Sequence, residues 1–197
     1  MFWLALGYPL LAHLAIWFDE TRLQWVALVW LLAVSLWGAL IARRAWAWIV
    51  LGLSAFALYW VVLGGGGLYA LYVPPAVIPA ALLIVFARSL RSGEQPWISR
   101  VATVMRGAPL PAPLVIYTRQ VTWLWCIVFV AMFASAVSLA IWARPELWSL
   151  MTNVVHYVVL GAVFVLEFAY RRIRYRELEP WGLFEYLRRL VRTNIKA

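Results

Sequence analysis

Residues 121–143 read VTWLWCIVFVAMFASAVSLAIWA, a run of 23 positions without a charged side chain. A helix needs about 20 apolar residues to cross the hydrocarbon core of a bilayer. Lipid offers no hydrogen bonds to the backbone, and the run lacks the alternating polarity of a barrel strand. The run therefore predicts a transmembrane helix.

Five further apolar runs of spanning length occur in the chain. Of the 197 residues, 66% are hydrophobic and 13% charged, whereas soluble domains have about 45–50% and about 25%. The six predicted spans are Phe2–Phe18, Leu23–Ala42, Ala45–Leu63, Leu68–Ala87, Val121–Ala143 and Leu150–Tyr170. The expected fold class is all-α, a polytopic membrane bundle of about six transmembrane helices.

The basic residues predict the orientation of these spans. With the N-terminus inside, 15 of the 17 Lys and Arg residues lie in cytoplasmic segments, and only Arg22 and Arg144 lie outside. The reverse orientation would place 15 of them outside. We therefore expect both termini in the cytoplasm, and we attribute the net charge of +9 to this asymmetry rather than to a nucleic-acid partner. The first run has no basic residue before it and no clear cleavage site after it, so a cleavable signal is not expected.

The spans divide the chain, as one structural domain, into four segments. These are residues 1–87 with the first four spans, 88–120 as a basic cytoplasmic loop, 121–170 with the last two spans, and 171–197 as a basic amphipathic tail. The loop and the tail each predict a short cytoplasmic helix lying on anionic inner-leaflet lipids.

In the loop, Pro96 suits a helix start and Gly107 a helix stop, and the tail helix would start at Pro180. The loop helix would have an apolar face of Trp97, Ile98, Val101, Val104 and Met105, and a polar face of Ser99, Arg100, Thr103 and Arg106. Residues 109–113, with three prolines, predict a stiff extended connector before the fifth span.

Arginines of the loop form a candidate docking surface: Arg91, Arg100, Arg106 and Arg119. They would suit an acidic cytoplasmic partner. The alternative is that they only follow the positive-inside rule and contact lipid headgroups.

Three polar residues lie within the predicted spans. Glu167 would be a proton-carrying or substrate-binding carboxylate, or an i,i+4 partner of Arg171 at the interface. Asn153 and His156 would bind a polar group between helices, or only hydrogen-bond across them.

Three prolines, Pro74, Pro75 and Pro79, interrupt the fourth span and predict either a broken helix at a transport site or a simple kink. The sequence contains no recognisable catalytic motif. The single cysteine, Cys126, excludes an internal disulfide and a Cys-rich metal site. His13 and His156, as two lone histidines, are a weak basis for haem, so neither a cofactor nor a metal is expected.

Residues 86–176 contain three characteristic stretches: RSLRSGEQP at 88–96, YTRQVT at 117–122 and EFAYRR at 167–172. This part of the chain resembles a family of small bacterial inner-membrane proteins that are commonly encoded among genes for aryl-polyene, xanthomonadin-like pigments. Those pathways build a polyene on acyl carrier proteins with enzymes like those of fatty-acid synthesis. The family's motif positions correspond to Arg91, Gly93, Pro96, Arg100, Arg106, Gly107, Tyr117, Thr118, Arg119, Thr122, Asn153, Glu167, Arg171 and Arg172.

The resemblance implies a multi-pass protein of the bacterial inner membrane, and it supplies no activity. Together with the basic loop it favours a non-catalytic accessory protein that docks acyl-carrier-protein-dependent enzymes at the cytoplasmic leaflet. Two alternatives stay open: a small carrier or flippase component for a lipid-like product, and a membrane enzyme acting on a lipid-linked acyl chain.

Overall fold

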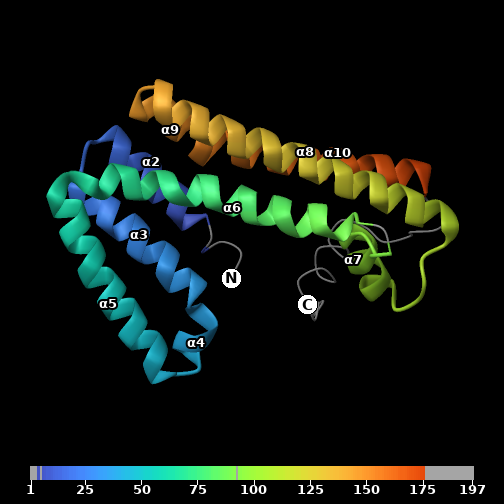
Figure 1. Cartoon of the computed structure of the whole chain (residues 1–197), viewed down its shortest axis with the longest axis horizontal. Coiled ribbons are helices and arrows are strands. Elements are labelled where there is room, and N and C mark those ends of the chain that lie inside the picture. Colours follow the sequence, from blue (N-terminus) through green and yellow to red (C-terminus); the bar gives the residue numbers. More distant parts are fainter. Residues whose placement is uncertain (1–3, 5, 92, 176–197) are drawn as a thin grey trace. The chain divides into compact units, whose positions relative to one another are not determined.

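The computed structural model describes Leu4, residues 6–91 and residues 93–175, and every regular element in these ranges is a helix (Figure 1). The elements are α2 (Gly7–Trp17), α3 (Thr21–Ser35), α4 (Trp37–Ile41), α5 (Ala45–Val61), η1 (Val62–Gly66), α6 (Gly67–Ser89), α7 (Trp97–Arg106), α8 (Ala112–Trp142), α9 (Pro145–Leu150), η2 (Met151–Val155) and α10 (His156–Arg174). The predicted all-α class is confirmed for the described residues.

Three helical segments are long and apolar enough to cross a membrane: Ala45–Ser89, Ala112–Trp142 and Pro145–Arg174. Only 17% of the most apolar stretch of the second segment is buried. Ile127 and Trp142 of that segment are 64% and 77% exposed. Large apolar side chains facing outward along such helices suit a lipid environment and would be costly in water.

The first of these segments is two helices joined by a tight turn. Gly65 has φ 82°, which interrupts the helical geometry between α5, with 17 residues, and α6, with 23. Glycine adopts a positive φ without a steric penalty. The glycine run 64–67 therefore forms a compact reversal, where α5 and α6 meet in Figure 1.

The chain divides into two compact units, and the division runs through α6, α8 and α10. The first unit consists of Met1–Ile78 and Met132–Tyr157, and the second of Pro79–Ala131 and Val158–Ala197.

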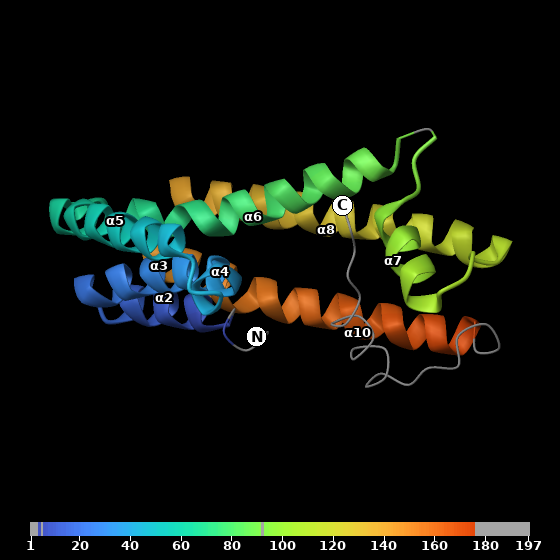
Figure 2. The same ribbon diagram turned by 90° about the horizontal axis from the view of Figure 1, so that it is seen from below.

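The first unit is built around α2 and α3, which lie side by side (Figure 2). Ala12 and Ala27 are fully buried, because small side chains allow helices to approach closely in a membrane protein. Two aromatic side chains in the same core satisfy their polar atoms. The Tyr8 hydroxyl donates to the Leu71 carbonyl at 3.1 Å, and Trp148 Nε1 donates to the Ala136 carbonyl at 3.1 Å.

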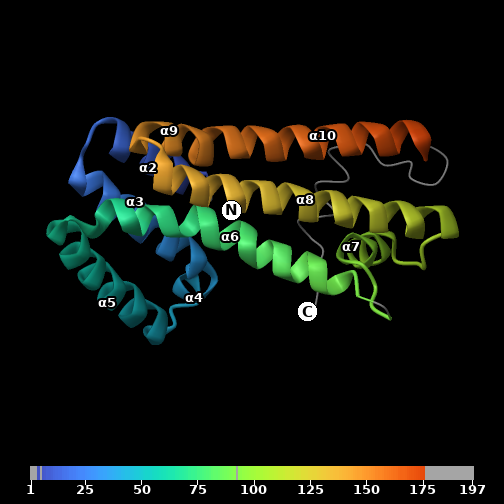
Figure 3. The ribbon, with the colours of Figure 1, turned by 45° about the horizontal axis from the view of Figure 1, so that its top comes forward.

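The second unit packs the short helix α7 against the first turns of α8 (Figure 3). Ser99 Oγ and Thr118 Oγ1 lie 2.6 Å apart, and both residues are buried. Ile98 packs against the α8 cluster of Leu114, Tyr117 and Val121.

Helix α7 has the predicted ends but not the predicted faces. It runs from Trp97 to Arg106, and Gly107 closes it in the left-handed conformation with φ 69°. Ser99, assigned to the polar face, is 1% exposed, whereas Val104, assigned to the apolar face, is 47% exposed. The face that packs on α8 therefore includes a hydroxyl, because Thr118 supplies its hydrogen bond. The tail helix expected from Pro180 lies outside the described residues.

Four prolines, at positions 74, 75, 79 and 113, lie within helices. Pro74, Pro75 and Pro79 all lie within α6, so none of them ends that helix. The connector at residues 109–113 is shorter than expected, because α8 already begins at Ala112. Pro113 is tolerated in the first turn, where its missing N–H would have no intrahelical partner.

Candidate functional site

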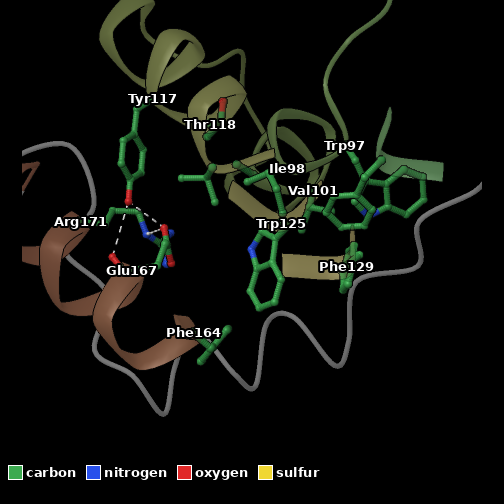
Figure 4. Close-up of a pocket in the computed structure, with 13 residues that line it drawn as sticks. Trp97, Ile98, Val101, Tyr117, Thr118, Trp125, Phe129, Phe164, Glu167 and Arg171 are labelled. Carbon is green, nitrogen blue, oxygen red and sulfur yellow. Dashed lines mark hydrogen bonds and ion pairs between the residues drawn. The ribbon is translucent and has the colours of Figure 1, made fainter. Parts of the chain in front are cut away.

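The second unit contains a pocket of about 300 Å³, formed by α6, α7, α8 and α10 (Figure 4). Four of its lining residues are polar or charged, and the others are apolar. The complete lining consists of Phe86, Trp97, Ile98, Val101, Ala102, Tyr117, Thr118, Val121, Trp125, Phe129, Phe164, Glu167 and Arg171.

One part of the pocket is aromatic. The Phe86 ring meets the Phe129 ring edge-on at 5.2 Å and tilts against Trp97 at 6.1 Å. Trp125 adds a further contact with Phe129 at 5.7 Å. Edge-to-face and tilted arrangements are those that aromatic quadrupoles favour. These rings hold one another, so the wall has a defined shape.

The opposite part of the pocket is polar (Figure 4). The Tyr117 hydroxyl donates to Glu167 Oε1 at 2.9 Å, and Arg171 Nε lies 3.2 Å from the same oxygen. The side chains of Arg171 and Glu167 are only 7% and 11% exposed. A buried ion pair is tolerated when further hydrogen bonds satisfy it, and Tyr117 supplies one.

The helices explain why these three groups meet. Glu167 and Arg171 are one turn apart on α10, which places them on the same helix face. Tyr117 comes from α8 and is held by ring contacts with Tyr170 at 5.9 Å and Tyr175 at 5.0 Å. The Glu167–Arg171 pair weighed in the sequence analysis is present, whereas the Tyr117 contact was missed, since nothing in the sequence links positions 50 residues apart.

Hydroxyl groups fix the start of α7 beside the pocket. The backbone N–H of Trp97 donates to Ser89 Oγ at 2.8 Å, and that of Ile98 to Thr122 Oγ1 at 3.4 Å. The first N–H groups of a helix lack partners within the helix, so these side chains replace them. The wall residues on α7 are thereby positioned by α6 and α8.

The predicted docking arginines all belong to the second unit, but they are not equivalent. Arg91 and Arg119 are exposed, and Arg119 Nη2 donates to the Leu90 carbonyl at 3.2 Å. Arg100 is half-buried, lies 3.9 Å from Glu94 and stacks over the Trp97 ring at 5.7 Å. Arg106 is also half-buried. The four arginines therefore come from the loop after α6, from α7 and from α8.

The other polar residues predicted within the spans lie in the first unit. His156 Nε2 is 2.9 Å from Ser135 Oγ, and Asn153 Nδ2 donates to Ser149 Oγ at 3.2 Å. His13 Nδ1 lies 3.0 Å from the same Ser149 hydroxyl. Asn153 Oδ1 and His156 Nδ1 are buried without a hydrogen-bond partner. The interhelical hydrogen bond weighed for His156 is thus present, and the predicted intramembrane polar set of Asn153, His156 and Glu167 is divided between the two units.

Comparison with protein-family models, with characterised proteins and with solved structures finds no match to this chain. The resemblance to the aryl-polyene-associated family therefore stays a prediction.

Proposed function

We propose that the protein is a non-catalytic membrane accessory protein that docks an acidic acyl carrier protein, or its synthase enzymes, at the cytoplasmic leaflet. The observation that carries this proposal is the charge of the second unit. Its described residues include eight arginines and two glutamates and no lysine or aspartate.

The two glutamates offset only two of these eight positive charges, and each lies beside an arginine. Glu94 pairs with Arg100, and Glu167 pairs with Arg171 in the pocket. Arg91 and Arg119 are both exposed, and they lie close together in the folded chain. Arg119 donates a hydrogen bond to the carbonyl of Leu90, the residue before Arg91. A concentrated positive surface attracts and orients an acidic partner.

The proposed topology has six spans, with both termini in the cytoplasm of a bacterial cell. Three segments have the length and composition for crossing a membrane, and the turn at Gly65 divides the longest of them into two helices. For the second span, α3 and α4 together cover residues 21–41. Reporter fusions in the turns at residues 19–20, 64–66 and 143–144 test the count: all three turns should report the periplasmic side.

Docking is tested by photo-crosslinking in native membranes. A photoreactive amino acid replaces Arg91 or Arg119, and mass spectrometry identifies what each captures. The matched control is Arg22, an exposed arginine in α3 of the first unit. We expect an acyl carrier protein or synthase subunit from positions 91 and 119 and not from position 22. Capture of lipids alone, or of the protein itself, from all three would overturn the proposal.

A charge-reversal variant gives an independent measurement. Arg100→Glu, Arg106→Glu and Arg119→Glu together should release the partner from the membrane and lower polyene yield. Raised ionic strength should weaken the wild-type association in the same direction, because salt screens exposed charges. Unchanged yield and enzyme localisation in the triple variant would contradict docking.

A further inference from the structure

The pocket of the second unit has the features of a small-molecule site, which the docking proposal does not use. We propose that it binds a single-chain amphiphile whose planar, unsaturated or aromatic hydrocarbon body lies against the aromatic wall. An uncharged end group that can form hydrogen bonds would lie at Tyr117, Glu167 and Arg171.

The order of residues along the helices sets the direction of this ligand. On α8, Tyr117, Val121, Trp125 and Phe129 follow one another at intervals of four, so they lie along one face. At 1.5 Å per residue, this face extends over about 18 Å. Its polar member is at the beginning and its aromatic members are at the far end.

Helix α10 also has a polar end and an apolar end, but its polar residues lie toward its C-terminus. Arg171 and Glu167 lie in its last two turns, and Phe164 lies about one turn before Glu167. Both helices therefore present a polar end and an apolar end to the same pocket, and the two polar ends meet at Glu167 Oε1. This gradient fits a molecule with a polar end and an apolar body.

The volume of the pocket fits a ligand with a single hydrocarbon chain. A volume of about 300 Å³ is at the lower limit of known ligand pockets, which have roughly 300–1,000 Å³. A phospholipid with two acyl chains needs more room than this. The tilted rings of Phe86, Trp97 and Phe129 favour a flat, polarisable body over a saturated one, because aromatic contacts add to the energy of area burial.

The charges at the polar end select an uncharged group. Glu167 and Arg171 compensate each other, so the buried end of the pocket has no net charge from these two residues. A carboxylate placed there would be buried next to Glu167 without a cation of its own, which is costly. A hydroxyl, phenol, amide or thioester end avoids this cost.

The test uses the full chain in nanodiscs and a fluorescent conjugated-tetraene alcohol as the probe, with the corresponding carboxylic acid as a second probe. We expect saturable binding of one alcohol per protein and at least tenfold weaker binding of the acid at pH 8. Equal or tighter binding of the acid would overturn the uncharged end group. Uptake that never saturates would mean that the probe only partitions into the bilayer, and would overturn the site itself.

Two matched variants on α7 locate the site. Ala102→Trp fills the pocket, whereas Val104→Trp adds the same ring at a 47% exposed position of the same helix. We expect Ala102→Trp to weaken alcohol binding at least tenfold and Val104→Trp to leave it unchanged. If both variants weakened alcohol binding equally, or if neither weakened it, the assignment to this pocket would be overturned. Tyr117→Phe keeps the ring and removes the hydroxyl, so it should weaken the alcohol several-fold without changing the melting temperature as much as Ala102→Trp does.

Two versions of the binding experiment distinguish where the ligand comes from. In one, the alcohol is supplied in vesicles with no protein partner; in the other, the corresponding acyl chain is supplied on an acyl carrier protein, and its thioester bond stays intact while the chain enters the pocket. If the pocket binds the probe from vesicles and not from the carrier, the ligand is a membrane-borne amphiphile. The binding site then stands even if the docking proposal fails. Faster loading from the carrier identifies a carrier-borne chain. Failure of both versions would overturn the proposal, whatever the crosslinking experiment shows.

Discussion

The Tyr117 hydroxyl lies 2.9 Å from Glu167 Oε1, which joins the beginning of α8 to the end of α10 across 50 positions of sequence. Arg171 approaches the same oxygen, so one carboxylate holds a phenol from one helix and a guanidinium from its own. The consequences of this arrangement are measurable.

Removing Glu167 alone should destabilise the second unit strongly. Glu167→Leu leaves the buried Arg171 without its carboxylate, and breaking a buried pair costs about 3–5 kcal/mol. The double variant Glu167→Leu, Arg171→Leu should recover most of that loss, because apolar replacement of a whole buried pair is often neutral. Thermal unfolding in detergent measures both.

The matched control for this pair is Glu94→Leu. Its partner Arg100 lies 3.9 Å away, and the side chains of Arg100 and Glu94 are 34% and 57% exposed. Exposed pairs contribute about 0–1 kcal/mol. A loss in Glu94→Leu as large as that in Glu167→Leu would contradict the buried-pair explanation.

The hydroxyl contact between α7 and α8 should contribute modestly to stability and strongly to local order. Thr118→Val removes the oxygen that lies 2.6 Å from Ser99 Oγ and leaves a buried hydroxyl unpaired, which costs about 1–3 kcal/mol. Amide hydrogen exchange in α7 should accelerate. Thr103→Val is the control, since its hydroxyl bonds within or beside α7 and does not reach α8.

A side chain at Gly65 should be poorly tolerated. Gly65→Ala forces a Cβ into φ 82°, and a non-glycine residue in the left-handed region costs about 1–2 kcal/mol. Gly64→Ala is the control, because Gly64 has no positive φ and a Cβ added there would meet no atom within 4 Å. Equal melting temperatures of the two variants would contradict the turn geometry.

The hydrogen bond between His156 and Ser135 should be weak despite its burial. Ser135→Ala removes the oxygen 2.9 Å from His156 Nε2. Such bonds in membrane proteins average about 0.6 kcal/mol, with a maximum near 1.7. His156→Ala should cost more, because it also empties a largely buried position. Thermal unfolding in detergent compares the two variants, and a larger loss in Ser135→Ala would contradict this ranking.

The apolar runs were sufficient to predict helices, because lipid allows only helices and closed barrels and the runs lack the alternating polarity of barrel strands. Local signals also predicted the ends of α7, since Pro96 and Gly107 act on the backbone at their own positions. Those features depend on neighbouring residues only.

Helix faces were harder to predict. On α7 the burial of Ser99 and the exposure of Val104 were missed, because the hydroxyl that pairs with Ser99 belongs to Thr118 on another helix. The pocket was missed for a different reason: α8 is apolar all round, so Trp125 and Phe129 look like any other apolar residues of that helix. Whether α6 would continue through Pro74, Pro75 and Pro79 depends on packing, which the sequence does not record.

The turn at Gly65 also affects how the chain enters a bilayer. The five residues of η1, Val62–Gly66, contain no ionisable side chain, whereas the turn between α8 and α9 contains Arg144 and is followed by Glu146. Carrying an arginine through the hydrocarbon core costs about 2.5–3.5 kcal/mol on the insertion scale, and the glycine turn has no such barrier. Helices α5 and α6 can therefore insert together without carrying an ionisable side chain of their turn across the hydrocarbon core.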